Sequence, residues 1–135
     1  MNCGTGSSDK RSNVLKNLDI VGGIIKYKSK KIVLLNQIHS NKLHYISKSS
    51  KLKNKFKGDA LITDRIGIPI AVLTADCVPI LLYENNKKMI GAIHAGWKGA
   101  YKGIITKVIK FMIKKGCSPK NITAAIGPCI SHNNY

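Results

Sequence analysis

The stretch VPILLYENNKKMIGAIHA, residues 78–95, decides the fold of this chain of 135 residues. Two apolar runs, VPILLYE and MIGAIHA, flank the four polar residues NNKK. This pattern is typical of two antiparallel strands joined by a short loop. We therefore predict a β-hairpin at the centre of the fold.

The predicted hairpin brings two reactive side chains to one of its ends. If Tyr83 faces Lys88 across a loop of about four residues, Cys77 faces His94 on the same side of the sheet. A thiol and an imidazole in this arrangement are either two metal ligands or a nucleophile and its base. The spacing alone leaves both readings open.

The rest of the chain predicts further strands and helices around the hairpin. Apolar residues recur at helical spacing in 100–116, and Gly116 is a good terminator. Ser7 and Ser8 precede a second, shorter amphipathic segment that ends near Leu18. Apolar and β-branched runs predict strands at 31–40, 59–64, 68–77 and 122–130, and a polar exposed loop at 48–58. Adjacent antiparallel hairpins favour an α/β fold with a mixed sheet and flanking helices.

Charge and composition narrow the function classes. The net charge of +17 supports non-specific attraction to phosphate groups. Arg11 and Arg65 are nevertheless the only arginines. Specific contacts to bases and bidentate hydrogen bonds to phosphate groups are made mainly by arginine. The lysines are also spread along the chain. We therefore do not expect nucleic acid to be the primary partner.

Membrane insertion and export are not expected either. No apolar run approaches the roughly 18 residues that a membrane span needs. The N-terminal residues lack the apolar core of a signal peptide. The four cysteines, Cys3, Cys77, Cys117 and Cys129, show no CxxC spacing, which favours reduced thiols and a cytoplasmic location.

A third potential metal ligand, His39, ends the predicted strand 31–40. Two histidines and one cysteinate would bind zinc and leave one coordination position for water, as catalytic zinc sites do. Such a metal lowers the pKa of water to roughly 7. Alternatively, His39 and His94 are partly buried structural histidines and Cys77 is a small core residue.

Five segments then suggest a family: NQIHS, GDALITD, TADCVPILL, AIHAGWKG and AIGPCI, in this order. Together they resemble the family once described as multicopper polyphenol oxidases or laccases, and now as purine nucleoside phosphorylases with adenosine deaminase activity. The resemblance runs from about Asn2 to Tyr135. It implies one partial domain over 1–135, with the α/β sandwich of YfiH-like, cysteine-hydrolase-like proteins. Because family members are longer at both ends, we expect the missing parts to cover the sheet and contribute substrate contacts.

The resemblance also implies a metal, its ligands and two reactions. In that family the matching residues bind zinc; here they are His39, Cys77 and His94. Phosphate would cleave adenosine, inosine and methylthioadenosine, and water would replace the amino group of adenosine. The expected partners are thus purine nucleosides and phosphate. A multicopper site is not expected, because the chain has only four histidines.

Candidate catalytic residues are Asp76, Cys77 and Gln37. Asp76 adjoins Cys77 and either transfers a proton or hydrogen-bonds at a strand end. Gln37 alternates with His39 along the predicted strand, and either contacts substrate or orients a ligand.

Candidate substrate or phosphate contacts are Gly96, Trp97, Lys98 and Asp59. The glycine-rich turn either offers amides to an anion or only permits a tight turn. Trp97 either stacks on a purine or packs the turn, and Lys98 would add positive charge. Asp59 either contacts substrate or caps a turn.

Two alternatives to a zinc-dependent purine nucleoside enzyme remain. In the first, Cys77 is a nucleophile with His94 as its base, in an amidohydrolase that acts on a peptidoglycan precursor. In the second, the chain is a non-catalytic remnant of the family or a basic binding protein. Tight zinc binding would count against the amidohydrolase, because a ligated thiolate is not free to attack.

Overall fold

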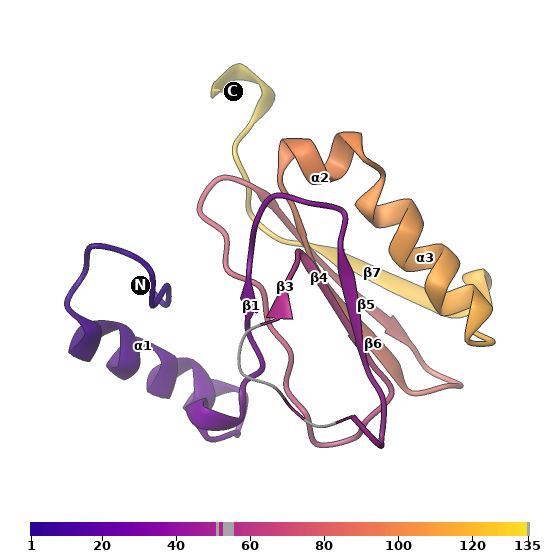
Figure 1. Cartoon of the computed structure of the whole chain (residues 1–135), viewed down its shortest axis with the longest axis horizontal. Coiled ribbons are helices and arrows are strands. Elements are labelled where there is room, and N and C mark those ends of the chain that lie inside the picture. Colours follow the sequence, from indigo (N-terminus) through magenta and orange to yellow (C-terminus); the bar gives the residue numbers. More distant parts are fainter. Residues whose placement is uncertain (51, 53–55, 135) are drawn as a thin grey trace.

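The computed structural model describes residues 1–50, 52 and 56–134 (Figure 1). Within these residues the centre is a five-stranded mixed sheet of order β2-β4-β6-β5-β7. β2 runs parallel to β4, and the other neighbours are antiparallel. The predicted mixed α/β fold is therefore confirmed. The strands are β2 (Leu43–Ile46), β4 (Ala60–Thr63), β5 (Val78–Glu84), β6 (Met89–Ala95) and β7 (Ile122–Ile126).

The predicted hairpin is present as β5 and β6, but its register differs from the prediction. Pro79 lies opposite His94, so the predicted pairing of Cys77 with His94 is wrong by two residues. Residues 85–88 alone form the loop, and Lys88 closes it with a left-handed φ of 53°. A shift of two residues leaves every side chain on its predicted face, because the side-chain period of a strand is two.

The predicted helix over 100–116 is two helices, α2 (Trp97–Tyr101) and α3 (Ile104–Lys114). Gly103 separates them with a left-handed φ of 72°, which glycine adopts at little cost. α3 lies along one face of the sheet, and α2 lies near the end of β6 (Figure 1). α3 holds the main core together through residues four apart, Ile104, Val108 and Met112, all fully buried.

A second small core lies on the other side of β4. It contains Leu35, Ile46 and Leu61, and the short parallel pair β1 (Leu35–Asn36) and β3 (Phe56–Lys57) lies next to it. The predicted strands 31–40 and 68–77 are mostly irregular; their backbones pair in a bridge between Val33 and Ile70, and the Gln37 side chain bonds to Leu73. The predicted exposed loop 48–58 lies partly outside the described residues, and the prediction is wrong at Phe56–Lys57, which form β3.

The predicted N-terminal helix is confirmed and is longer than expected, as α1 (Arg11–Ile24). Ser7 and Ser8 do not cap it; Lys10 occupies the cap position without a side-chain hydrogen bond. α1 lies to one side of the sheet (Figure 1). No helix of the described residues is long and apolar enough to span a membrane. Single-turn 3-10 helices within the described residues are Ser29–Lys31, Pro119–Asn121 and His132–Asn134.

Candidate metal centre

The three predicted ligands meet at one end of the hairpin. His94 is near the end of β6, Cys77 directly precedes β5, and His39 lies in the loop after β1. Their ligand atoms all lie within 4.8 Å of one another, and Cys77 Sγ is 3.8 Å from His39 Nε2. Around a tetrahedral zinc ion the sulfur and nitrogen ligands are roughly 3.6 Å apart. The donor types and their spacing therefore fit a zinc-type metal.

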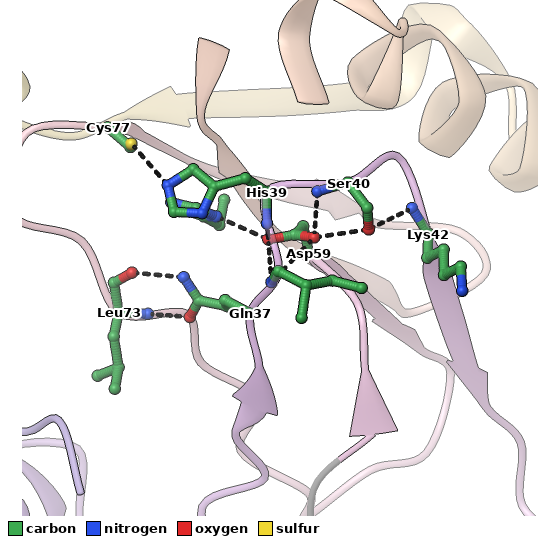
Figure 2. A network of polar contacts seen from close by, with 9 residues as sticks. Gln37, His39, Ser40, Lys42, Asp59, Leu73 and Cys77 are labelled. Carbon is green, nitrogen blue, oxygen red and sulfur yellow. Dashed lines mark hydrogen bonds and ion pairs between the residues drawn. The ribbon is translucent and has the colours of Figure 1, made fainter. Parts of the chain in front are cut away.

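Asp59 bonds to both histidines, to the backbone of His39 (Figure 2) and to the side chain of His94. Its side chain is fully buried, and its Oδ1 accepts a hydrogen bond from the His39 N–H at 3.0 Å. The same oxygen lies 2.9 Å from His94 Nδ1. Since a carboxylate only accepts, it favours the tautomer with the proton on Nδ1 and leaves Nε2 of His94 for a metal.

The backbone of His39 is held in an uncommon conformation. Its φ is 53°, in the left-handed region that few residues with a Cβ occupy. Three successive amides, those of Ile38, His39 and Ser40, donate to the Asp59 carboxylate, and the Ser40 hydroxyl adds a fourth contact at 2.7 Å. These bonds offset the conformational cost of about 1–3 kcal/mol. Asp59 thereby sets the direction in which the His39 ring leaves the chain.

The pKa values of Asp59 and Cys77 shift in opposite directions. Burial alone raises the pKa of the Asp59 carboxyl, but hydrogen bonds from Ser40, His94 and His39 outweigh burial and hold it below its usual value. Burial, followed by the charges of Asp76 and Asp59, raises the pKa of the Cys77 thiol. At neutral pH the site thus holds a carboxylate anion and a thiol that must lose its proton when a metal binds.

Gly96 provides the space in which the three ligands approach each other. A Cβ at this position would lie 2.6 Å from His39 Cδ2, and 3.3 Å from both Cys77 Sγ and His94 Cε1. The φ of Gly96 is −69°, which any residue adopts. Space, rather than backbone conformation, therefore requires glycine here. Gly99 acts similarly, because its Cβ would lie 2.8 Å from the Ser40 carbonyl oxygen.

An open pocket of about 830 Å³ lies over the three ligands. Residues 72–77 form one wall and the N-terminal residues 1–4 contribute another. Gln37 fixes the first wall: its Nε2 donates to the Leu73 carbonyl and its Oε1 accepts the Leu73 N–H, both at 2.7 Å (Figure 2). The amide of Gln37 is thus committed to the wall that carries Asp76 into the pocket.

Three further predicted site residues lie either at the start of α2 or beneath the three candidate ligands. Trp97 and Lys98 are exposed at the start of α2, with the lysine Nζ 5.3 Å from the centre of the indole ring. Asp59 lies beneath the metal ligands and not at the pocket surface. Ser40 was missed by sequence reasoning. Its only sequence signal is its position directly after the histidine of NQIHS.

The fold and the three donor residues together define a class of protein. Residues 1–135 match the family that is described as multi-copper polyphenol oxidoreductase laccase. The chain belongs to this family. It is 37% identical over 135 residues to a purine nucleoside phosphorylase of Corynebacterium glutamicum, covering 99% of this chain and 55% of that protein. It is 34% identical over 128 residues to a purine nucleoside phosphorylase of Rickettsia prowazekii, covering 95% of this chain and 51% of that protein.

Two solved structures have the same fold as this chain. The crystal structure of the Bacillus licheniformis protein YfiH superimposes with a TM-score of 0.92 at 31% identity, over 99% of this chain and 53% of that one. YlmD from Geobacillus stearothermophilus gives a TM-score of 0.89 at 29% identity, with the same coverage of both chains. The family resemblance and the YfiH-like fold are therefore confirmed. The chain spans about half the length of the relatives it matches.

Proposed function

We propose that this chain carries the catalytic centre of a zinc-dependent purine nucleoside enzyme. Its main reaction would be the phosphorolysis of adenosine, inosine and methylthioadenosine, with deamination of adenosine as a second activity. The observation that carries the proposal is the group of His39, Cys77 and His94 beneath an open pocket. Relatives named purine nucleoside phosphorylases supply the substrate class.

Each residue around the pocket has a role in this proposal. His39, Cys77 and His94 would hold the zinc ion, which supplies Lewis acidity and acidifies a water molecule. Asp59 holds the two histidines in place, so its role is positioning rather than substrate contact. Asp76 is exposed at the pocket beside Cys77, and is the carboxylate available to exchange a proton with a substrate.

Lys98 and Gly96 receive different roles. Lys98 is exposed at the start of α2, two residues after Gly96, and would attract the phosphate co-substrate by its charge. Gly96 serves the packing of the metal ligands, because its missing Cβ makes room for them.

A cysteine-type amidohydrolase is less well supported. Cys77 Sγ lies near His39 Nε2, as a nucleophile lies near its base. The pKa of the thiol is nevertheless raised, whereas nucleophilic cysteines need a lowered pKa. Asp59 binds Nδ1 of His94, which the sequence suggested as the base, and leaves Nε2 for a metal or for a proton, so this contact favours neither function.

Zinc analysis with two cysteine variants tests the proposal. We expect close to one zinc per chain in the purified protein, little in Cys77→Ser, and an unchanged amount in Cys129→Ser, whose cysteine is exposed. The zinc-loaded protein should then release hypoxanthine from inosine only when phosphate is present, and ammonia from adenosine. A metal-free protein would refute the zinc centre. Zinc without turnover would identify the chain as a non-catalytic member of the family.

A further inference from the structure

A second pocket, smaller than the first, adjoins the metal centre. Its volume is about 460 Å³. We call it the Trp97 pocket; it is lined by Asp76, Cys77, Val78, Ala95, Trp97, Ala100, Ile130 and Asn134. Five of these eight residues are apolar, and the pocket lies between the start of α2 and the segment that follows β7.

Trp97 has the exposure of a ligand contact rather than of a packing residue. It is the only tryptophan of the chain, and 60% of its surface is exposed. A tryptophan that served to pack the turn would bury most of its large apolar surface, because such burial is strongly favourable. An exposed indole on the wall of an apolar hollow instead offers a flat face to a flat ligand.

The Trp97 pocket shares two of its lining residues with the pocket over the candidate metal centre. Cys77 and Asp76 border both this pocket and the larger one above the three ligands. The opposite wall is tied to the same place, since the Ile130 N–H donates to the Asp76 carbonyl at 2.9 Å. A ligand seated against Trp97 therefore extends to within reach of the metal ligands.

We propose that the Trp97 pocket binds the purine base of the nucleoside, while the ribose and phosphate occupy the larger pocket. A purine has flat faces that stack on an aromatic ring, and an edge of N–H groups and ring nitrogens. Asp76 and Asn134 are polar residues of this pocket, and can accept hydrogen bonds from that edge. The inference rests on the proposed function for its substrate class.

Trp97 itself reports on the binding. Because no other tryptophan is present, the indole fluorescence of the chain comes from this residue alone. Titration of the zinc-loaded protein with hypoxanthine should quench the fluorescence in a saturable manner. Inorganic phosphate, which has no aromatic face, should leave it unchanged.

The position of the binding site is tested by measuring the affinity of variants for hypoxanthine with equilibrium dialysis. Trp97→Ala should weaken binding roughly 5- to 150-fold, the loss expected for one base–aromatic stack, and Trp97→Phe should recover part of it. Ala100→Leu should block the pocket, on an exposed helical position where leucine is tolerated. Tyr101→Ala is the matched control, because Tyr101 is 89% exposed in the same helix but does not border the pocket. Unchanged zinc content and circular dichroism establish that the variants fold.

The outcomes separate this inference from the proposed function. If Trp97→Ala and Ala100→Leu bind hypoxanthine as tightly as Tyr101→Ala while inosine is still cleaved, the base pocket is wrong and the proposed function stands. If binding depends on Trp97 but inosine is not cleaved, the base pocket stands and phosphorolysis is refuted. If hypoxanthine does not bind the unmodified chain, the inference is overturned.

Discussion

Asp59 is fully buried, yet its carboxylate contacts both histidines of the candidate metal centre. A buried carboxylate is costly unless hydrogen-bond donors surround it, and here Ser40, His39, Ile38 and His94 provide them. The same bonds that stabilise the charge also orient one histidine ring and the backbone of the other. Stability and metal affinity therefore depend on the same side chain.

Replacing Asp59 with asparagine should weaken zinc binding by roughly 10- to 100-fold, the usual loss when the partner of a ligating histidine is removed. Asparagine has nearly the same shape but places an NH2 group where donors converge. Competition with a chromophoric chelator measures the affinity. Asp19→Asn, at an exposed position in α1, removes the same charge and should bind zinc normally. Equal affinities in the two variants would contradict the role given to Asp59.

Gly96→Ala tests whether space at one position controls the site. The added methyl would overlap the His39 ring, which must move away and take one ligand with it. We expect zinc affinity to fall by more than about 10-fold, while the metal-free protein keeps its fold. Gly23→Ala is the control, since nothing lies within 4 Å of its Cβ and the exchange should be neutral or slightly stabilising. Normal zinc binding by Gly96→Ala would show that the ligands adjust to the methyl.

Among the elements, the irregular segment 69–73 shows how a side chain replaces a strand. The backbone of Val33 bonds to Pro69 and Ala71, and the next step of the ladder comes from the Gln37 amide, which pairs with Leu73. Pro69 lacks the N–H that a regular ladder needs. This wall of the pocket is thus an extended segment held by the Val33 backbone and by one side chain.

Gln37→Ala should leave the Leu73 N–H and C=O unpaired and loosen this wall. The local opening free energy should fall by about 1–3 kcal/mol, seen as faster hydrogen exchange at the Leu73 amide. The Ala71 amide, bonded to the Val33 carbonyl, is an internal control and should exchange as before. Reduced turnover with unchanged exchange at Leu73 would instead assign Gln37 to catalysis.

Tyr45 connects β2 to α3, and its surroundings raise the pKa of its hydroxyl. Its ring lies 5.2 Å from that of Phe111, and Lys115 Nζ lies 4.5 Å from its centre. Partial burial, together with a hydrogen bond to Asp64 and the charge of that carboxylate, raises the pKa of Tyr45 to about 12.

The raised pKa of Tyr45 predicts the sign of an effect at high pH. A folded-state pKa above the unfolded value of 10.0 means a contribution that is fully present below pH 10 and lost as the pH rises towards 12. Absorbance titration should show one tyrosinate transition near pH 12 that disappears in Tyr45→Phe. The exposed Tyr101→Phe should retain it. A transition unaffected by Tyr45→Phe would contradict the assignment.

The sequence predicted elements where a pattern is local. The hairpin, β4, α1, α3 and β7 follow from apolar periodicity and turn residues, which a single segment displays. It missed β2 (Leu43–Ile46), which is short and which the parallel pairing with β4 stabilises. It also placed a strand at 68–77, where apolar residues face a small second core without a regular partner. Periodicity indicates burial; only the neighbouring chain determines whether a ladder forms.

At the scale of the whole molecule, the chain spans about half the length of its relatives and contains the three residues of the candidate metal centre. α3 covers one face of the sheet, but Leu81 on β5 and Ile126 on β7 remain 54% and 70% exposed. β7 is also an edge strand. An apolar edge of this kind favours association, which the net charge of +17 opposes.

We therefore expect association that increases with salt, because screening weakens the repulsion between copies. Ile126→Lys should suppress it, by placing a charge on the edge strand. Ile66→Lys adds the same charge at a position that is 85% exposed in a loop and should have less effect. Light scattering across protein and salt concentrations measures both. Equal suppression by the two variants would point to net charge alone rather than to the β7 edge.

The sequence by itself determined which residues could bind a metal, their order along the chain and the hairpin that places two of them at one end, because donor chemistry and strand periodicity are local properties. The tertiary structure decided the rest. The register differs by two residues from the simplest loop geometry, and Asp59 meets His94 across 35 positions of sequence. The left-handed backbone of His39 and the space at Gly96 depend on groups that pack together only after folding. No local pattern records such contacts, because they arise from the three-dimensional neighbours of each residue.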